Sequence, residues 1–106
     1  MANIVIATEK DFDELIKSAD TVLVDFYATW CPPCKMLAPV LEKVAKKIGD
    51  NYLIVKVNVD ECEKLAQRFG IMSVPTMVFV YGGEERKRLV GYRQEKEIID
   101  TLTNLD

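Results

Sequence analysis

The chain has 106 residues, of which 49% are hydrophobic and 29% charged, with a formal net charge of -3. This length and composition describe one small domain with a core of its own, which excludes a disordered segment. The 14 basic residues are scattered among 17 acidic ones, and no apolar run approaches the roughly 18 residues that span a bilayer, so neither nucleic acid nor a membrane is an expected partner.

Alternating periodicity predicts nine elements, in the order strand 3–6, helix 9–18, strand 21–28, helix 33–48, strand 52–60, helix 61–70, strand 77–81, strand 85–92 and helix 94–104. Thr8 and Asp11 are expected to cap the first helix. The strand over 21–28 is apolar on both faces, which is typical of a central strand. Single helices between strands imply parallel crossovers, and the Gly82-Gly83 turn adds an antiparallel edge. The predicted fold class is α/β, with one mixed sheet and helices on both faces.

Organisation and location follow from what the sequence lacks. The first residues carry no basic stretch followed by a long apolar segment, as a secretion signal would. Three cysteines are too few for a secreted disulfide scaffold, and no linker or repeat divides the chain. We therefore predict a soluble, cytoplasmic protein with a single domain over residues 1–106.

Two cysteines three positions apart, Cys31 and Cys34, stand where the central strand ends and the long helix begins. Reaction sites of open α/β sheets gather at that edge. A thiolate at Cys31 would face unpaired backbone N–H groups and the positive end of the helix dipole, which lowers the pKa of the thiol from about 8.5. Because Cys34 follows one helical turn later, we predict that Cys31 attacks a disulfide and that Cys34 resolves the mixed disulfide.

Two other uses of the cysteine pair stay open. A zinc site needs about four ligands, but the chain has no histidine and only Cys62 besides the pair. A structural disulfide across so short a loop would restrain the unfolded chain little. We expect no metal and no bound cofactor, since a nucleotide-binding glycine motif is also missing. Cys62 itself is expected to be a half-buried small residue of the third helix.

Asp25 lies in the middle of a strand built otherwise of apolar and aromatic residues. Because burial raises the pKa of a carboxyl group, Asp25 is a candidate to take the proton from Cys34 and to return it later. Lys56, on the strand expected next to it, is a candidate to pair with Asp25 and to lower that pKa again. An ion pair between strands, with no catalytic part, is the alternative.

Several spaced segments resemble the thioredoxin family over practically the whole chain: VDFYATWCPPCKMLAPVLEKVA, VKVNVDE, FGIMSVPTMVFVYGGE and VGY. The resemblance implies the thioredoxin fold, in the order βαβαβαββα, and a thiol-disulfide oxidoreductase with Cys31 as nucleophile. It also implies a cis peptide bond before Pro75, which would present the backbone of Val74 to an extended client segment, although an ordinary proline at the start of a strand is the alternative. The surface implied for client binding is uncharged and consists of Trp30, Pro32, Val74, Pro75 and Gly91.

The chain departs from the family's pattern at two positions. Pro32 stands where the family usually has Gly, which removes one backbone N–H near the sulfurs and stiffens the loop. The lost donor weakens stabilisation of the thiolate, whereas the stiffer loop can favour either redox form, so the sequence does not predict whether Pro32 raises or lowers the reduction potential. Tyr27 stands where the family often has Trp, and we expect it to affect fluorescence and packing more than thiol exchange.

The function predicted from these features is general protein disulfide reduction, with electrons carried only on sulfur. The expected partners are client proteins with exposed disulfides and, by resemblance, a flavin-dependent thioredoxin reductase that returns the electrons. A monomer is expected. A disulfide oxidase or isomerase, and a binding module with incidental redox activity, are the alternatives.

Overall fold

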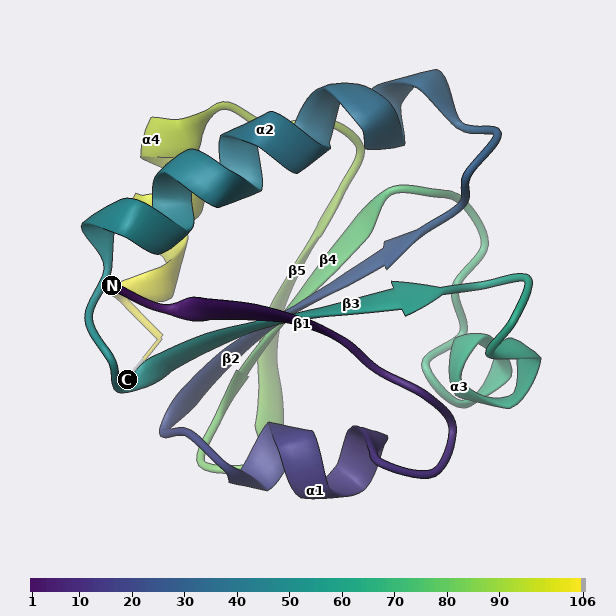
Figure 1. Ribbon diagram of the computed structural model, residues 1–106, viewed down its shortest axis with the longest axis horizontal. Helices are drawn as coiled ribbons and strands as arrows, with labels where there is room; N and C mark the ends of the chain where they lie inside the picture. The colour runs from purple at the N-terminus through teal and green to yellow at the C-terminus, as the bar shows by residue number, and fades with distance from the viewer. Residues whose placement is uncertain (106) are drawn as a thin grey trace.

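A five-stranded mixed sheet, covered by helices on both faces, organises the computed structural model, which describes residues 1–105 (Figure 1). The elements in chain order are β1 Asn3–Ile6, α1 Phe12–Lys17, β2 Thr21–Tyr27, α2 Pro32–Lys47, β3 Tyr52–Asn58, α3 Glu63–Arg68, β4 Thr76–Tyr81, β5 Glu84–Val90 and α4 Glu95–Leu102. The predicted fold class and the order βαβαβαββα are therefore confirmed.

The strands lie in the order β1-β3-β2-β4-β5. β3 pairs in parallel with both β1 and β2, whereas β4 runs antiparallel to β2 and to β5. β2 is thus the central strand, and its residues from Thr21 to Phe26 are all buried. This matches the prediction made from its apolar residues on both faces.

Alternate residues of β2 enter two separate apolar cores. Leu23 packs in the core that α2 and α4 cover, with Leu37 and Leu41 of α2. Val22 and Val24 pack in the other core, which α1 and α3 cover. Because successive side chains of a strand point to opposite faces, Asp25 and Tyr27 share the Leu23 face, under α2.

The first helix begins later than the sequence predicts. The Thr8 N–H donates to Asp11 Oδ1 at 2.6 Å, and the Asp11 N–H donates to Thr8 Oγ1 at 3.3 Å. This reciprocal pair closes a turn over residues 8–11, and the helix proper starts at Phe12. The predicted capping contacts are present, but they bound a turn that precedes the helix.

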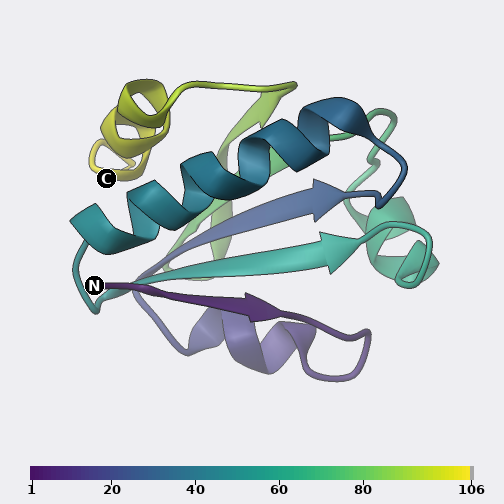
Figure 2. The same cartoon turned by 45° about the horizontal axis from the view of Figure 1, so that its top comes forward.

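The carboxyl ends of the parallel strands lie at one end of the molecule, beside the start of α2 and beside α3 (Figure 2). The loops that follow β2 and β3 therefore meet there, as crossover connections in a parallel sheet require. None of the helices in the described part of the chain combines the length and hydropathy needed to cross a membrane.

Candidate active site

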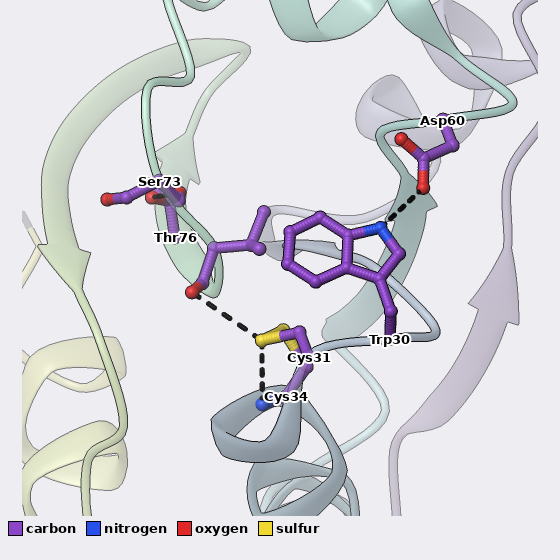
Figure 3. The surroundings of a disulfide bond; sticks show 7 residues. Trp30, Cys31, Cys34, Asp60, Ser73 and Thr76 are labelled. Carbon is purple, nitrogen blue, oxygen red and sulfur yellow. Dashed lines mark hydrogen bonds between the residues drawn. A yellow bond between two sulfur atoms is a disulfide. The ribbon is translucent and has the colours of Figure 1, made fainter.

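Cys31 and Cys34 form a disulfide at the amino end of α2 (Figure 3). Cys31 is the N-cap residue in extended conformation, and Pro32 and Pro33 fill the first helical positions, where a missing N–H has no consequence for the helix. The helical turn then brings Cys34 back beside Cys31, with 5.2 Å between their Cα atoms. The predicted juxtaposition of the two sulfurs is confirmed.

One backbone donor points at the sulfur of Cys31. The Cys34 N–H lies 3.2 Å from Cys31 Sγ, and it belongs to the first turn of α2, where backbone N–H groups have no partner within the helix. On the opposite side, the carbonyl oxygen of Val74 lies 3.6 Å from the same sulfur. When the disulfide is open, the N–H can stabilise a thiolate at Cys31, and the carbonyl can accept a hydrogen bond from the S–H of the thiol form.

Access to the sulfurs is narrow. Cys31 is 3% exposed and Cys34 is 5% exposed, and both pack against Ala28, Tyr27 and Val74. The two sulfurs are therefore largely shielded from water. Such an environment is partly dry, which strengthens the electrostatic effect of the helix terminus on a sulfur anion.

Trp30, directly before Cys31 in the chain, is 66% exposed. Its Nε1–H donates to Asp60 Oδ2 at 2.9 Å (Figure 3). Asp60 is held in turn, because its backbone N–H and that of Glu61 donate to Asn58 Oδ1 at 2.9 Å and 3.2 Å. Asp60, two residues after the end of β3, was not singled out from the sequence.

The loop before β4 forms the other wall of the site. The Val74–Pro75 peptide bond is cis, as the resemblance implied. The Gly91 N–H donates to the Pro75 carbonyl at 2.8 Å, so Gly91 lies directly beside this loop. Gly91 has a φ of +93°, a conformation that residues with a Cβ rarely adopt.

A hollow of about 170 Å3 lies between these two walls, lined by Trp30, Val59, Ile71, Met72, Ser73 and Val74. Met72 is 96% exposed, and Met36 on α2 is 58% exposed. Of the predicted client surface, Trp30 and Val74 line this hollow, Pro32 is exposed on α2, and Gly91 is beside Pro75 outside it. The two exposed methionines were not singled out from the sequence.

Asp25 is buried beneath this site, with 1% of its surface exposed. Its Oδ1 has no hydrogen-bond partner among residues 1–105. Desolvation raises the pKa of the Asp25 carboxyl to about 6, and the positive charge of Lys56 acts in the opposite direction. The predicted elevation of the Asp25 pKa is therefore present.

Lys56 stands directly beside Asp25 in the parallel register of β2 and β3. Its Nζ, however, lies 4.6 Å from the centre of the Tyr27 ring, in a cation–π contact. No ion pair within 4 Å joins Lys56 to Asp25 in the described residues, so the ion pair considered from the sequence is not formed. The strand register places Lys56 beside Asp25, but the ammonium group of Lys56 lies over the Tyr27 ring.

Cys62 lies on the far side of the sheet from the disulfide. It is the N-cap residue of α3, and its side chain is buried in the core that α1 and α3 cover, which is deeper than the half-buried position predicted. Burial raises the pKa of its thiol. Among residues 1–105 there is no group of three or more histidine, cysteine or acidic side chains placed to hold a metal ion.

Comparison with known proteins gives one consistent family. The thioredoxin family model matches residues 3–104. A thioredoxin of Alicyclobacillus acidocaldarius subsp. acidocaldarius is 43% identical over 98 residues, which are 92% of this chain and 93% of that protein. A bifunctional thioredoxin reductase/thioredoxin of Mycobacterium leprae (strain TN) is 39% identical over 94 residues, which are 89% of this chain and 20% of that protein. A solved mutant thioredoxin from Halobacterium salinarum NRC-1 has a TM-score of 0.89 at 34% identity and covers 98% of this chain and 90% of its own. The chain belongs to the thioredoxin family.

Proposed function

We propose that this protein is a general protein disulfide reductase that works by thiol-disulfide exchange at Cys31 and Cys34. The observation that carries this proposal is the disulfide at the start of α2, with a backbone N–H aimed at Cys31 Sγ. That geometry supplies both a stabilised sulfur anion and a second sulfur placed to close the ring.

The reaction starts from the reduced pair. The Cys31 thiolate attacks one sulfur of a client disulfide, the client S–S bond breaks, and its second sulfur leaves as a thiolate that takes up a proton. Cys34 then loses its proton and attacks Cys31 Sγ in the mixed disulfide, which releases the first client sulfur. Two electrons have passed to the client, and the protein is left with the disulfide seen in the structure.

Asp25 is proposed as the group that accepts the proton of Cys34, directly or through a water molecule. A pKa of about 6 supports this role, because such a carboxyl can bind and release a proton near neutral pH. The burial of Asp25 under α2 supports it further, since no bulk water competes there for the proton. Lys56 contributes a positive charge that favours the ionised carboxylate.

Client recognition is proposed at the two walls of the hollow. An extended client segment would pair with the backbone of Val74 as an added strand, between Trp30 on one side and Pro75 and Gly91 on the other. Pro32 would complete an uncharged surface at the start of α2. The exposed apolar side chain of Met72 favours clients with an apolar residue near the reacting cysteine.

The remaining features of the proposal concern the working cycle. A thioredoxin reductase would return the electrons, since this chain holds no nucleotide-binding motif of its own. We propose that one domain over residues 1–106 acts as a monomer in the cytoplasm. The Cys-Pro-Pro-Cys sequence makes it a variant of the family's active site, in which Pro32 withholds one N–H donor from the sulfurs.

Trapping tests the proposal. The Cys34→Ser variant, mixed in reduced form with a protein that has exposed disulfides, should accumulate a covalent complex through Cys31, because the resolving sulfur is gone. The Cys31→Ser variant is the matched control and should trap nothing. Trapping by the Cys31→Ser control, or no trapping by either variant, would contradict the proposed order of attack. A reduction potential far more oxidising than the cytosolic glutathione pool would instead favour the oxidase or isomerase.

A further inference from the structure

The ammonium group of Lys56 has two possible partners, the Asp25 carboxyl group and the Tyr27 ring, and in the structure it contacts the ring. Lys56 is the neighbour of Asp25 in register, and both Asp25 and Tyr27 point to the face under α2. The ammonium nevertheless lies over the Tyr27 ring, 4.6 Å from its centre. Asp25 Oδ1 is left without a hydrogen-bond partner in the described part of the chain.

This arrangement is informative because it runs against the simplest electrostatic expectation. A buried carboxylate with an unsatisfied oxygen attracts a nearby cation strongly, and leaving it unpaired is unfavourable. A neutral carboxyl group attracts the cation far less. The face of an aromatic ring attracts an ammonium group in either case, so it holds Lys56 whenever Asp25 carries its proton.

We propose that Tyr27 is a positioning residue that provides a second resting place for the Lys56 ammonium. The cation lies on the ring while the Asp25 carboxyl is neutral, and it moves to the carboxylate when the proton leaves. The Tyr27 ring and the Asp25 carboxylate therefore compete for one cation. The catalytic meaning of this competition rests on the proposed proton role of Asp25, but the competition itself follows from the geometry alone.

Other titratable groups also face Tyr27. The charges of Asp25 on the same strand and of Glu61 after β3 both act on its hydroxyl group, with a smaller effect from Cys62 in the core on the other face of the sheet. Burial, followed by the charge of Glu61, raises the pKa of the Tyr27 hydroxyl, so the ring is neutral and its face stays attractive to a cation at physiological pH. Glu61 is a further anion that acts on Tyr27, and the test must separate its effect from that of the ring.

The first test is an NMR titration of the Asp25 carboxyl carbon in the oxidised protein. Tyr27→Leu removes the ring and should lower the Asp25 midpoint by about half a pH unit, the equivalent of one exposed cation–π contact. Tyr27→Phe keeps the ring face and should keep the wild-type midpoint. In a Glu61→Gln background, Tyr27→Leu should still lower the Asp25 midpoint by the same amount.

The same substitution is then made in the Lys56→Met variant. In that background, Tyr27→Leu should no longer lower the Asp25 midpoint, because the cation that couples the Tyr27 ring to the Asp25 carboxyl group is gone. An equal decrease with and without Lys56 would overturn the inference, since the ring would then act through burial alone. An unchanged midpoint in Tyr27→Leu would overturn it as well.

A second measurement uses only the wild-type protein and does not depend on how the variants fold. Ring currents of Tyr27 should shift the side-chain methylene protons of Lys56 upfield at pH values below the Asp25 midpoint, and this shift should shrink as the pH passes it. Methylene signals that do not change with pH would overturn the inference. Because neither measurement involves a client, a protein that fails to reduce disulfides would refute the proposed function and leave this result standing.

Discussion

Replacing Asp25 with Asn removes one buried ionisable group while nearly keeping its shape. The folded protein binds the Asp25 proton with a pKa of about 6, against an ordinary value of 3.8 for the unfolded chain. Well below pH 3.8 Asp25 is protonated in both the folded and the unfolded state, and between the two pKa values mainly the folded state keeps the proton. The free energy of unfolding of the wild type therefore decreases as the pH rises through this window, and the decrease ends above the folded pKa.

The size of this decrease follows from the two pKa values. Their difference of about 2.2 units corresponds to about 3 kcal/mol, at about 1.36 kcal/mol per unit. About 2 kcal/mol of this falls between pH 4.5 and pH 8. Asp25→Asn carries no ionisation at this position, so its stability relative to the wild type should rise by that amount across the same range.

Chemical unfolding of both oxidised proteins at a series of pH values measures the effect. The difference between the two free energies of unfolding is the relevant quantity, because contributions from all other titrating groups cancel. Any packing cost of the amide shifts this difference equally at every pH. A difference that stays flat from pH 4.5 to pH 8 would refute the reasoning, and one that falls with rising pH would mean that the Asp25 pKa is lowered by folding.

Three further substitutions probe the surroundings of the disulfide. Asp60→Ala should reduce kcat/KM for client reduction about fivefold and leave the reduction potential unchanged, because Trp30 loses the hydrogen bond that orients it. Equal kcat/KM values for the variant and the wild type would show that this bond does not orient Trp30 for client reduction. Gly91→Ala should lower the free energy of unfolding in urea by about 1–2 kcal/mol, because a φ of +93° strains any residue with a Cβ; an unaffected midpoint would show that the loop relaxes freely. Cys62→Ala should lower stability by about 1 kcal/mol and leave client reduction intact, since its thiol lies in the opposite core; a lost activity would assign it a role in exchange.

The strands and the place of the cysteine pair could be predicted because short-range patterns determine them. Runs of branched apolar residues identify β2 and β3, and the proline pair after Cys31 marks the first turn of a helix. The start of α1 was predicted too early for an equally local reason. Thr8 and Asp11 have the spacing of a helix cap, but the same hydrogen bonds also close an isolated turn.

The contacts that the sequence did not predict join residues far apart in the chain. Trp30 and Asp60 are 30 positions apart, and nothing in either neighbourhood indicates that an indole N–H needs that carboxylate. The position of Lys56 was predicted correctly beside Asp25, yet its partner was not. Which of two attractive groups takes a flexible ammonium depends on angstrom-scale geometry and on the proton of Asp25, and neither is encoded in a spacing pattern.

In the proposed mechanism, the start of α2 stabilises a sulfur anion at Cys31 and leaves Cys34 to resolve the mixed disulfide. The pH dependence of alkylation of the fully reduced protein, with the modified residue identified by mass spectrometry, tests it most directly. Cys31 should react first, with a midpoint clearly below the ordinary thiol pKa of about 8.5. Preferential modification of Cys34, or a Cys31 midpoint at or above that value, would contradict it.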